Sequence, residues 1–324
     1  MNGDCLKLTS YFGERDRTSN AFVADALLDL FGREGLATSV LLRGTEGFGE
    51  KHVLQTQRLL SLSEDLPVVA VAVDLRERIE ALVPEVRSLV GEGLVTLERA
   101  RMATGKLEPV DVSGPAKLTV YCGRSDPVYE LVALLQRHGL AGATALLGVD
   151  GTTRGARRRA RFLGRNADVP LMVISVGDGE RLGAVLPEIG VLLRDPIVTL
   201  EGITVCRRDG VAVDEPRVPG PSVWQKLMIY TSEQARHGRH PLHLALIRRL
   251  REEGAIGATA LRGFWGYHGD HAPHGDRLLS LRRHVPVVTV VVDRPDRARR
   301  WLDVVSDYTS HTGLVTSEMV PVAL

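Results

Sequence analysis

Short sequence blocks recur three times along this chain, in the same order and roughly 110 residues apart. A solenoid unit repeats roughly every 20–45 residues, so a period this long is that of a whole domain. We therefore predict three similar domains, although a length of 324 residues alone would favour about two. The pattern K-L-x-x-Y opens each copy, and the blocks lie at 7–11, 117–121 and 226–230; 37–44, 143–148 and 258–263; 67–74, 170–178 and 286–293; and 93–96, 196–199 and 313–316.

Glycine and proline gather in two stretches between these blocks, at 103–115 and 207–222. Such a composition is typical of linkers between domains. The predicted organisation is repeat 1 (1–104), a linker (105–115), repeat 2 (116–206), a second linker (207–223) and repeat 3 (224–324).

Each repeat is predicted to follow the order β-α-β-β-α-β, which is that of the ferredoxin-like fold in the α+β class. In repeat 1 the first strand carries the K-L-x-x-Y block, and apolar residues between 22 and 31 recur with helical spacing. We expect Ser19 to be the N-cap of this helix and Gly35 its C-cap. A second strand should end at Arg43, followed by a strand over 68–73, a helix over 76–90 and a strand over 94–97.

Composition narrows the class of protein. With 44% hydrophobic and 25% charged residues the chain should be globular, and a net charge of +1 argues against a dedicated nucleic-acid binder. The longest apolar runs, 66–73 and 285–292, are shorter than the ~18 residues of a membrane helix, so the chain should not span a membrane. The first residues lack the apolar run of a signal peptide, and the three cysteines form no C-x-x-C motif. We therefore expect a cytoplasmic protein with reduced thiols.

Several blocks together resemble one known family. These are Lys7-Leu8 with Tyr11, the loop at 42–49 and the segments 62–69 and 93–98, and they resemble domain-of-unknown-function family 190, which is similar to the PII signalling proteins. The resemblance is specific over 6–102, good over 225–320 and weaker over 116–205. PII-like proteins are ferredoxin-like trimers that bind small effectors, often adenine nucleotides, in clefts between subunits. A mobile loop after their second strand transmits the ligand state to a partner, commonly a membrane transporter.

The resemblance implies a regulatory protein without enzymatic activity, which binds a small anionic effector and signals to a membrane channel or transporter. It also implies that three joined PII-like units close on one another as an intrachain pseudo-trimer. The alternatives are that each repeat forms trimers separately or that the repeats sit like beads along the chain.

The glycine-rich loop after the second strand is the candidate binding site. Its glycines let backbone N–H groups approach an anion, arginine supplies positive charge, and an aromatic ring could stack on a base. Repeat 2 has lost both the arginine and the aromatic residue, so we expect unequal sites. The alternative is a flexible glycine loop between strands. The candidate ligand-binding residues are Arg43, Gly44, Glu46, Gly47, Phe48 and Gly49 in repeat 1, and Arg262, Gly263, Trp265 and Gly266 in repeat 3.

Two other functions remain open from the residues. Eight of the ten histidines lie in repeat 3, and His268, His271 and His274 have a spacing that could ligate zinc or copper. In this alternative the chain is a metal-binding or metal-tolerance protein. An enzyme using Glu46, Glu50 and His52 is the third hypothesis, although no G-x-S-x-G, Walker or H-E-x-x-H motif is present.

Six arginines between 154 and 165 form the densest basic run of the chain. Such a run could contact phosphates, but charge runs usually lie on a solvated face. We interpret this one as the exposed face of a helix.

Overall fold

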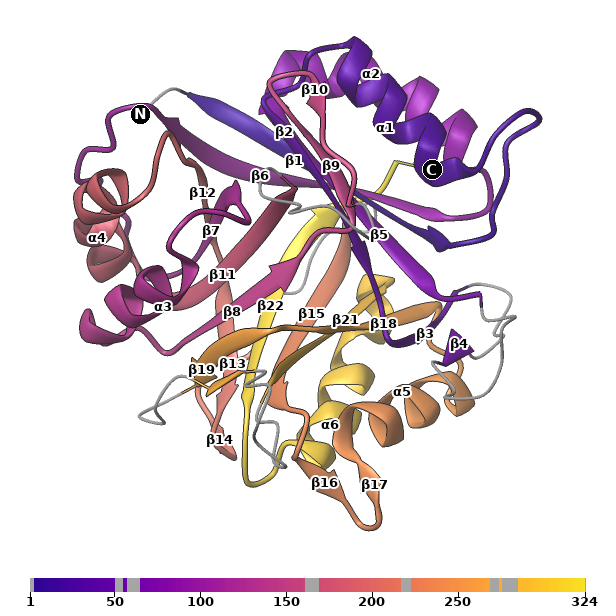
Figure 1. The fold of residues 1–324 in the computed structure, drawn as a ribbon. Coiled ribbons are helices and arrows are strands. Elements are labelled where there is room, and N and C mark those ends of the chain that lie inside the picture. Colours follow the sequence, from indigo (N-terminus) through magenta and orange to yellow (C-terminus); the bar gives the residue numbers. More distant parts are fainter. Residues whose placement is uncertain are drawn as a thin grey trace.

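The computed structural model describes residues 3–49, 55–56, 65–160, 169–216, 223–268, 274–275 and 285–323. Within these residues the chain is a mixed α/β protein with six α-helices and large antiparallel sheets. Figure 1 shows the helices on the outside of the molecule and the strands of all three repeats converging toward its middle. No helix in the described ranges has both the length and the apolar character needed to cross a membrane.

The elements recur in the same order in each repeat. In repeat 1 they are β1 (Asp4–Gly13), α1 (Val23–Arg33), β2 (Thr38–Arg43), β3 (Glu46–Phe48), β4 (Gln55–Thr56), β5 (Pro67–Leu75), α2 (Arg76–Val90) and β6 (Leu94–Thr104). Repeat 2 and the segment after it contain β7 (Pro115–Gly123), α3 (Val128–Arg137), β8 (Gly142–Leu147), β9 (Asp150–Thr153), β10 (Ala156–Arg157), β11 (Pro170–Asp178), α4 (Gly179–Leu192), β12 (Ile197–Gly202), β13 (Thr204–Arg208) and β14 (Val211–Ala212). Repeat 3 contains β15 (Val223–Ser232), β16 (Arg236–His237), β17 (His240–Pro241), α5 (Leu242–Glu252), β18 (Gly257–Arg262), β19 (Trp265–His268), β20 (His274–Gly275), β21 (Pro286–Asp293), the 3-10 helix η1 (Pro295–Arg297), α6 (Ala298–Tyr308) and β22 (Leu314–Pro321).

Each repeat builds a four-stranded antiparallel sheet, in the order β2-β5-β1-β6 in repeat 1. Successive side chains of a strand point to opposite faces, and both faces of this sheet are apolar. In β5, Val68 and Ala70 pack beneath α1 and α2, whereas Val69 and Val71 join a core that all three repeats share. The Val-rich third strands are therefore continuous apolar runs because they are buried on both faces.

The start of the first helix differs from the prediction. Ser19 does not cap α1, which begins at Val23 with Phe22 as its N-cap residue and without a side-chain cap. The reason is a small turn before the helix: Arg17 bridges Phe22, and the Thr18 hydroxyl accepts a hydrogen bond from the Ala21 amide at 3.1 Å. At the other end Glu34 is the C-cap, and Gly35 follows it with a positive φ of 61°.

The last strands join one repeat to the next. β6 continues beyond the predicted 94–97 because its second half pairs with β12, from Thr104 opposite Ile197 to Arg101 opposite Leu200. In the same way β13, which follows β12, pairs with β22 of repeat 3. The circuit closes where Val322, after β22, bridges Thr96 of β6.

The segment after each second strand crosses to a neighbouring repeat. β3 of repeat 1 pairs with β18 of repeat 3, β9 of repeat 2 with β2 of repeat 1, and β19 of repeat 3 with β8 of repeat 2. We call these three strands the crossing strands. Because of these pairings two continuous sheets, of twelve and eight strands, each contain strands from more than one repeat.

Candidate functional site

The glycines of the predicted loops are explained first by the crossing strands. A Cβ atom on Gly47 would lie 2.7 Å from the Ala258 carbonyl oxygen of the neighbouring repeat, which is too close for any other residue. The corresponding glycines of the other two crossing strands have even less space. A Cβ on Gly151 would lie 2.3 Å from the Ser39 carbonyl oxygen, and one on Gly266 would lie 2.2 Å from the Ala143 carbonyl oxygen. Contact between repeats therefore accounts for the glycine at this position of each crossing strand, and ligand binding by these residues stays a prediction.

Arginine–glutamate pairs lie at the base of two of these segments. Arg43 ends β2 and donates to one carboxylate oxygen of Glu14 from both Nε (3.1 Å) and Nη2 (2.8 Å). Arg262 ends β18 and binds Glu233 through both oxygens, at 3.0 and 3.2 Å. Both pairs are partly open to solvent. Repeat 2 has Leu147 at the position of the arginine, so its boundary lacks this pair.

The residue directly before the second glycine differs at each boundary, and at two of the three boundaries it contacts a helix of the neighbouring repeat. Glu46 faces His243 of α5, with 3.3 Å between Oε2 and Nε2. Trp265 packs edge-on against Tyr129 of α3, with 4.8 Å between the ring centroids. Asp150 instead binds Arg157 at 2.7 Å.

Arg157 shows that the basic run is no helical face. It lies on β10, after a turn in which Arg154 and Gly155 both have positive φ, so the helix interpretation is wrong here. Its guanidinium reaches 2.6 Å from Asp25 and 2.5 Å from Asp29, both on α1 of repeat 1. The run therefore joins two repeats. Arg161 and Arg165 lie outside the described residues.

The remaining predicted ligand residues lie as follows. Phe48 is 3% exposed and packs in the apolar core of repeat 3, so its ring stabilises the crossing strand. The amide of Gly44 donates to the Pro67 carbonyl at 2.8 Å, and that of Gly263 to the equivalent Pro286 at 2.8 Å. A Cβ on Gly49 would meet no atom within 4 Å.

The predicted metal ligands fall at the edge of the described chain. His268 lies at the end of β19, and His274 lies on β20 opposite Gly266. His271 lies outside the described residues, as do Glu50 and His52 of the enzyme hypothesis. The metal and enzyme hypotheses remain predictions.

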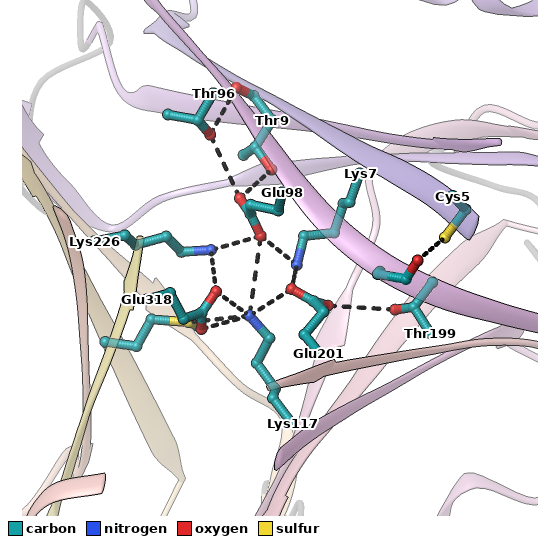
Figure 2. Close-up of polar contacts among 12 residues, drawn as sticks. Cys5, Lys7, Thr9, Thr96, Glu98, Lys117, Thr199, Glu201, Lys226 and Glu318 are labelled. Carbon is teal, nitrogen blue, oxygen red and sulfur yellow. Dashed lines mark hydrogen bonds and ion pairs between the residues drawn. The ribbon is translucent and has the colours of Figure 1, made fainter. Parts of the chain in front are cut away.

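Six charged side chains meet at the centre of the molecule, and sequence reasoning did not assign them. Each repeat contributes a lysine from its first strand and, directly opposite in the strand register, a glutamate from its last strand. All six are at least nine-tenths buried, and Figure 2 shows them pointing toward one another. We call this set the central charge cluster; it consists of Lys7, Glu98, Lys117, Glu201, Lys226 and Glu318.

The contacts of the central charge cluster run in a circle. Each lysine binds the glutamate of its own repeat and also that of the next repeat. The ammonium of Lys7 lies 2.5 Å from Glu98 and 2.6 Å from Glu201. The contacts to the next repeat are 2.6 Å from Lys117 to Glu318 and 2.9 Å from Lys226 to Glu98 (Figure 2).

Charge pairing keeps most of this cluster ionised. Burial alone would raise the pKa of Glu98, but the ammonium groups of Lys226 and Lys7 outweigh it and hold that pKa well below its ordinary value. The pKa of Glu318 is lowered in the same way, against burial, by Lys117 and Lys226. Burial alone would lower the pKa of Lys226, but the carboxylates of Glu318 and Glu98 outweigh it and raise that pKa. Lys117 differs, because burial outweighs its carboxylate partners and lowers its pKa.

Carboxylates of the cluster could be considered for a metal ion, since oxygen atoms of Glu98, Glu201 and Glu318 lie within 4.8 Å of one another. However, three ammonium groups lie among them and neutralise their charge. A divalent cation would have to displace these groups, so the residues fit a closed ionic network better than a metal centre.

A sequence signal for this cluster exists. A lysine stands at the same place in three strands that are mostly apolar, and T-x-E occurs near the end of all three repeats, at 96–98, 199–201 and 316–318. Lysine and glutamate are rarely buried unless paired. Their threefold recurrence in core strands therefore indicates a shared buried network.

Comparison with known proteins identifies similar sequences. The model of family DUF190, described as "Uncharacterized ACR", matches at 5–102, 116–205 and 224–322. A UPF0166 protein of Aquifex aeolicus (strain VF5) is 33% identical over 96 residues, which make up 30% of this chain and 90% of that protein. The matched stretch is about as long as one of the three repeats.

Proposed function

Because this chain belongs to the DUF190 family, whose model matches it three times, we propose that it is a non-enzymatic, PII-like regulatory protein of the cytoplasm. In this proposal the three repeats are ferredoxin-like units that pack as an intrachain pseudo-trimer. The effector is a small anion, most simply an adenine nucleotide, bound at boundaries between repeats. The cyclic strand pairing and the central charge cluster support this arrangement.

One observation carries the effector proposal: arginine–glutamate pairs that are partly open to solvent occur at equivalent places in repeats 1 and 3. An anion that reaches Arg43 would compete with Glu14 for the same guanidinium donors. The same exchange would take place at Arg262, where the anion would replace Glu233.

Displacement of the glutamate would also affect hydrogen bonds to the neighbouring repeat, because they lie close to each arginine in the chain. Two residues beyond Arg43, the Thr45 amide donates to the Ala260 carbonyl of repeat 3 at 2.9 Å. Two residues beyond Arg262, Phe264 donates in the same way to Ala145 of repeat 2, also at 2.9 Å. An effector would therefore bias the position of a crossing strand, and a partner such as a membrane channel or transporter would recognise the difference.

Isothermal titration calorimetry with ATP, ADP and AMP tests this proposal. We expect two sites per chain, one of which is lost in Arg43→Ala and both in the Arg43→Ala/Arg262→Ala variant. Arg248→Ala is the control, because Arg248 is exposed and has no carboxylate partner in the described chain. Unchanged affinity in the folded double variant would contradict the proposal, and nucleotide turnover on incubation would favour an enzyme instead.

A further inference from the structure

Three equivalent seams lie where the last strand of one repeat reaches the last strand of the next. The seam between repeats 1 and 2 is covered by the linker that follows β6. Leu107 of this linker is 4% exposed and packs against Gly190 of α4, and the Val110 amide donates to the Gly183 carbonyl at 3.4 Å.

The seam between repeats 2 and 3 is covered by the β13–β14 hairpin. The Asp209 amide donates to the Gly313 carbonyl at 2.8 Å. A Cβ on Gly210 would lie 2.1 Å from the Ser310 carbonyl oxygen, so the hairpin is pressed against the end of α6. In two seams, then, the chain itself fills the space beside the strands.

The seam between repeats 3 and 1 is different. Its described backbone contacts are the Thr96–Val322 bridge and a 3.0 Å hydrogen bond from the Ala323 amide to the Val95 carbonyl. Beside them lies a cavity of about 540 Å³ between α2, the start of β6 and the start of β15. A volume of roughly 300–1,000 Å³ is typical of small-molecule sites.

The lining of this cavity has two chemical characters. Trp224, which is 8% exposed, forms an apolar wall together with Leu94 and Val322. Arg87 and Ser88, on the last turn of α2, form a polar wall. Arg87 is exposed and pairs with no carboxylate among the described residues; Gly190 holds the equivalent place in α4, where Leu107 fills the space. The acidic residue at the rim is Glu92.

We propose that this cavity binds one amphipathic organic anion per chain. The aromatic or aliphatic body of the ligand lies against Trp224, and its carboxylate or sulfonate group binds the Arg87 guanidinium. A charged group bound by an arginine and an apolar body in a partly enclosed site are complementary to the two walls. This site shares no residue with the one at Arg43 and Arg262, so it does not depend on the proposed function.

Titration with 8-anilinonaphthalene-1-sulfonate tests the site, because this probe is an aromatic anion whose fluorescence rises in apolar surroundings. We expect saturable binding of one probe per chain. Arg87→Glu should weaken it about tenfold or more, since a hydrogen bond to a charged group is lost and repulsion takes its place. Ser88→Phe should abolish it by filling the cavity. Arg137→Glu is the matched control, because Arg137 is an exposed arginine in the last turn of α3.

Thermal unfolding of each variant shows whether it is folded, and Ser88→Phe keeps the test decisive if Arg87→Glu is unstable. Absence of saturable binding would overturn the proposal. Binding that neither variant changes would place the probe elsewhere on the surface and would overturn it as well. An equal loss in Arg137→Glu would mean that overall charge, rather than Arg87, holds the probe.

Discussion

At the scale of single residues, the central charge cluster balances a large cost of burial. An isolated charge in an apolar interior loses its hydration, and only close partners offset that loss. Here three ammonium groups and three carboxylates share one space, and secondary contacts add to them, such as the 3.1 Å hydrogen bond that the Thr9 hydroxyl donates to Glu98. The cluster is therefore sensitive to the loss of any single member.

The lowered pKa values of Glu98 and Glu318 predict a particular pH dependence of stability. A carboxyl group with a depressed pKa in the folded state stabilises the fold above its unfolded pKa, and this contribution is lost as the pH falls. We expect the free energy of unfolding to decline below pH 4.5, the ordinary value for glutamate. Urea unfolding between pH 7 and pH 3 measures it.

The control for this pH profile is the paired variant Glu98→Leu/Lys226→Met, which removes one carboxylate and one ammonium together and leaves the cluster neutral. Its stability should fall less steeply below pH 4.5. Equal slopes in the two proteins would mean that other carboxylates cause the acid sensitivity.

At the scale of elements, the crossing strands depend on glycine. Gly151→Val would place a Cβ 2.3 Å from the Ser39 carbonyl oxygen and force β9 away from β2. Overpacking of this kind typically costs about 1–3 kcal/mol of stability. Chemical unfolding measures the loss, and Gly49→Ala is the control because its Cβ would meet no atom within 4 Å. A Gly151→Val protein as stable as the control would show that this pairing contributes little.

The elements themselves could be predicted from sequence, whereas their partners could not. Recurring blocks located the strand that ends at Arg43 and the helix over 76–90, because strand and helix patterns are local. The crossing strands and the extension of β6 to Thr104 depend on backbone hydrogen bonds with segments far away in the chain, which leave no local periodicity. For the same reason the sequence did not show that Gly47, Gly151 and Gly266 contact the backbone of a neighbouring repeat.

At the scale of the whole molecule, the three repeats share one core. The apolar cluster at the centre takes side chains from every repeat, among them Val71, Ile174 and Val290. The ionic circle lies in the same region and links the repeats in turn. An isolated repeat would expose one face of its sheet and would separate its lysine from the glutamate of the next repeat.

This shared core predicts that damage in repeat 1 is detected in repeat 3. Glu98→Gln leaves Lys226 short of a carboxylate, and breaking a buried pair costs about 3–5 kcal/mol. All three tryptophans lie in repeat 3, so their fluorescence reports on that repeat, whereas far-UV circular dichroism reports on the whole chain. We expect both signals to shift to the same lower urea midpoint.

The control for this experiment is Glu85→Gln, which removes an exposed ion pair with Arg33 and should cost less than about 1 kcal/mol. Two separate transitions, with the fluorescence midpoint unchanged in Glu98→Gln, would show that the repeats unfold independently.

The circle of lysines and glutamates also depends on the number of repeats in the chain. Each repeat donates a cation to its successor and accepts one from its predecessor, and the third returns to the first. Deleting or duplicating a whole repeat would change the rotation between neighbours and separate charges that now meet. Where the crossing strands meet neighbouring helices, the contacts differ from one boundary to the next. They are Glu46 with His243, Trp265 with Tyr129, and Arg157 with Asp25. A chain with one repeat removed or added would therefore lose this closed circle of charges.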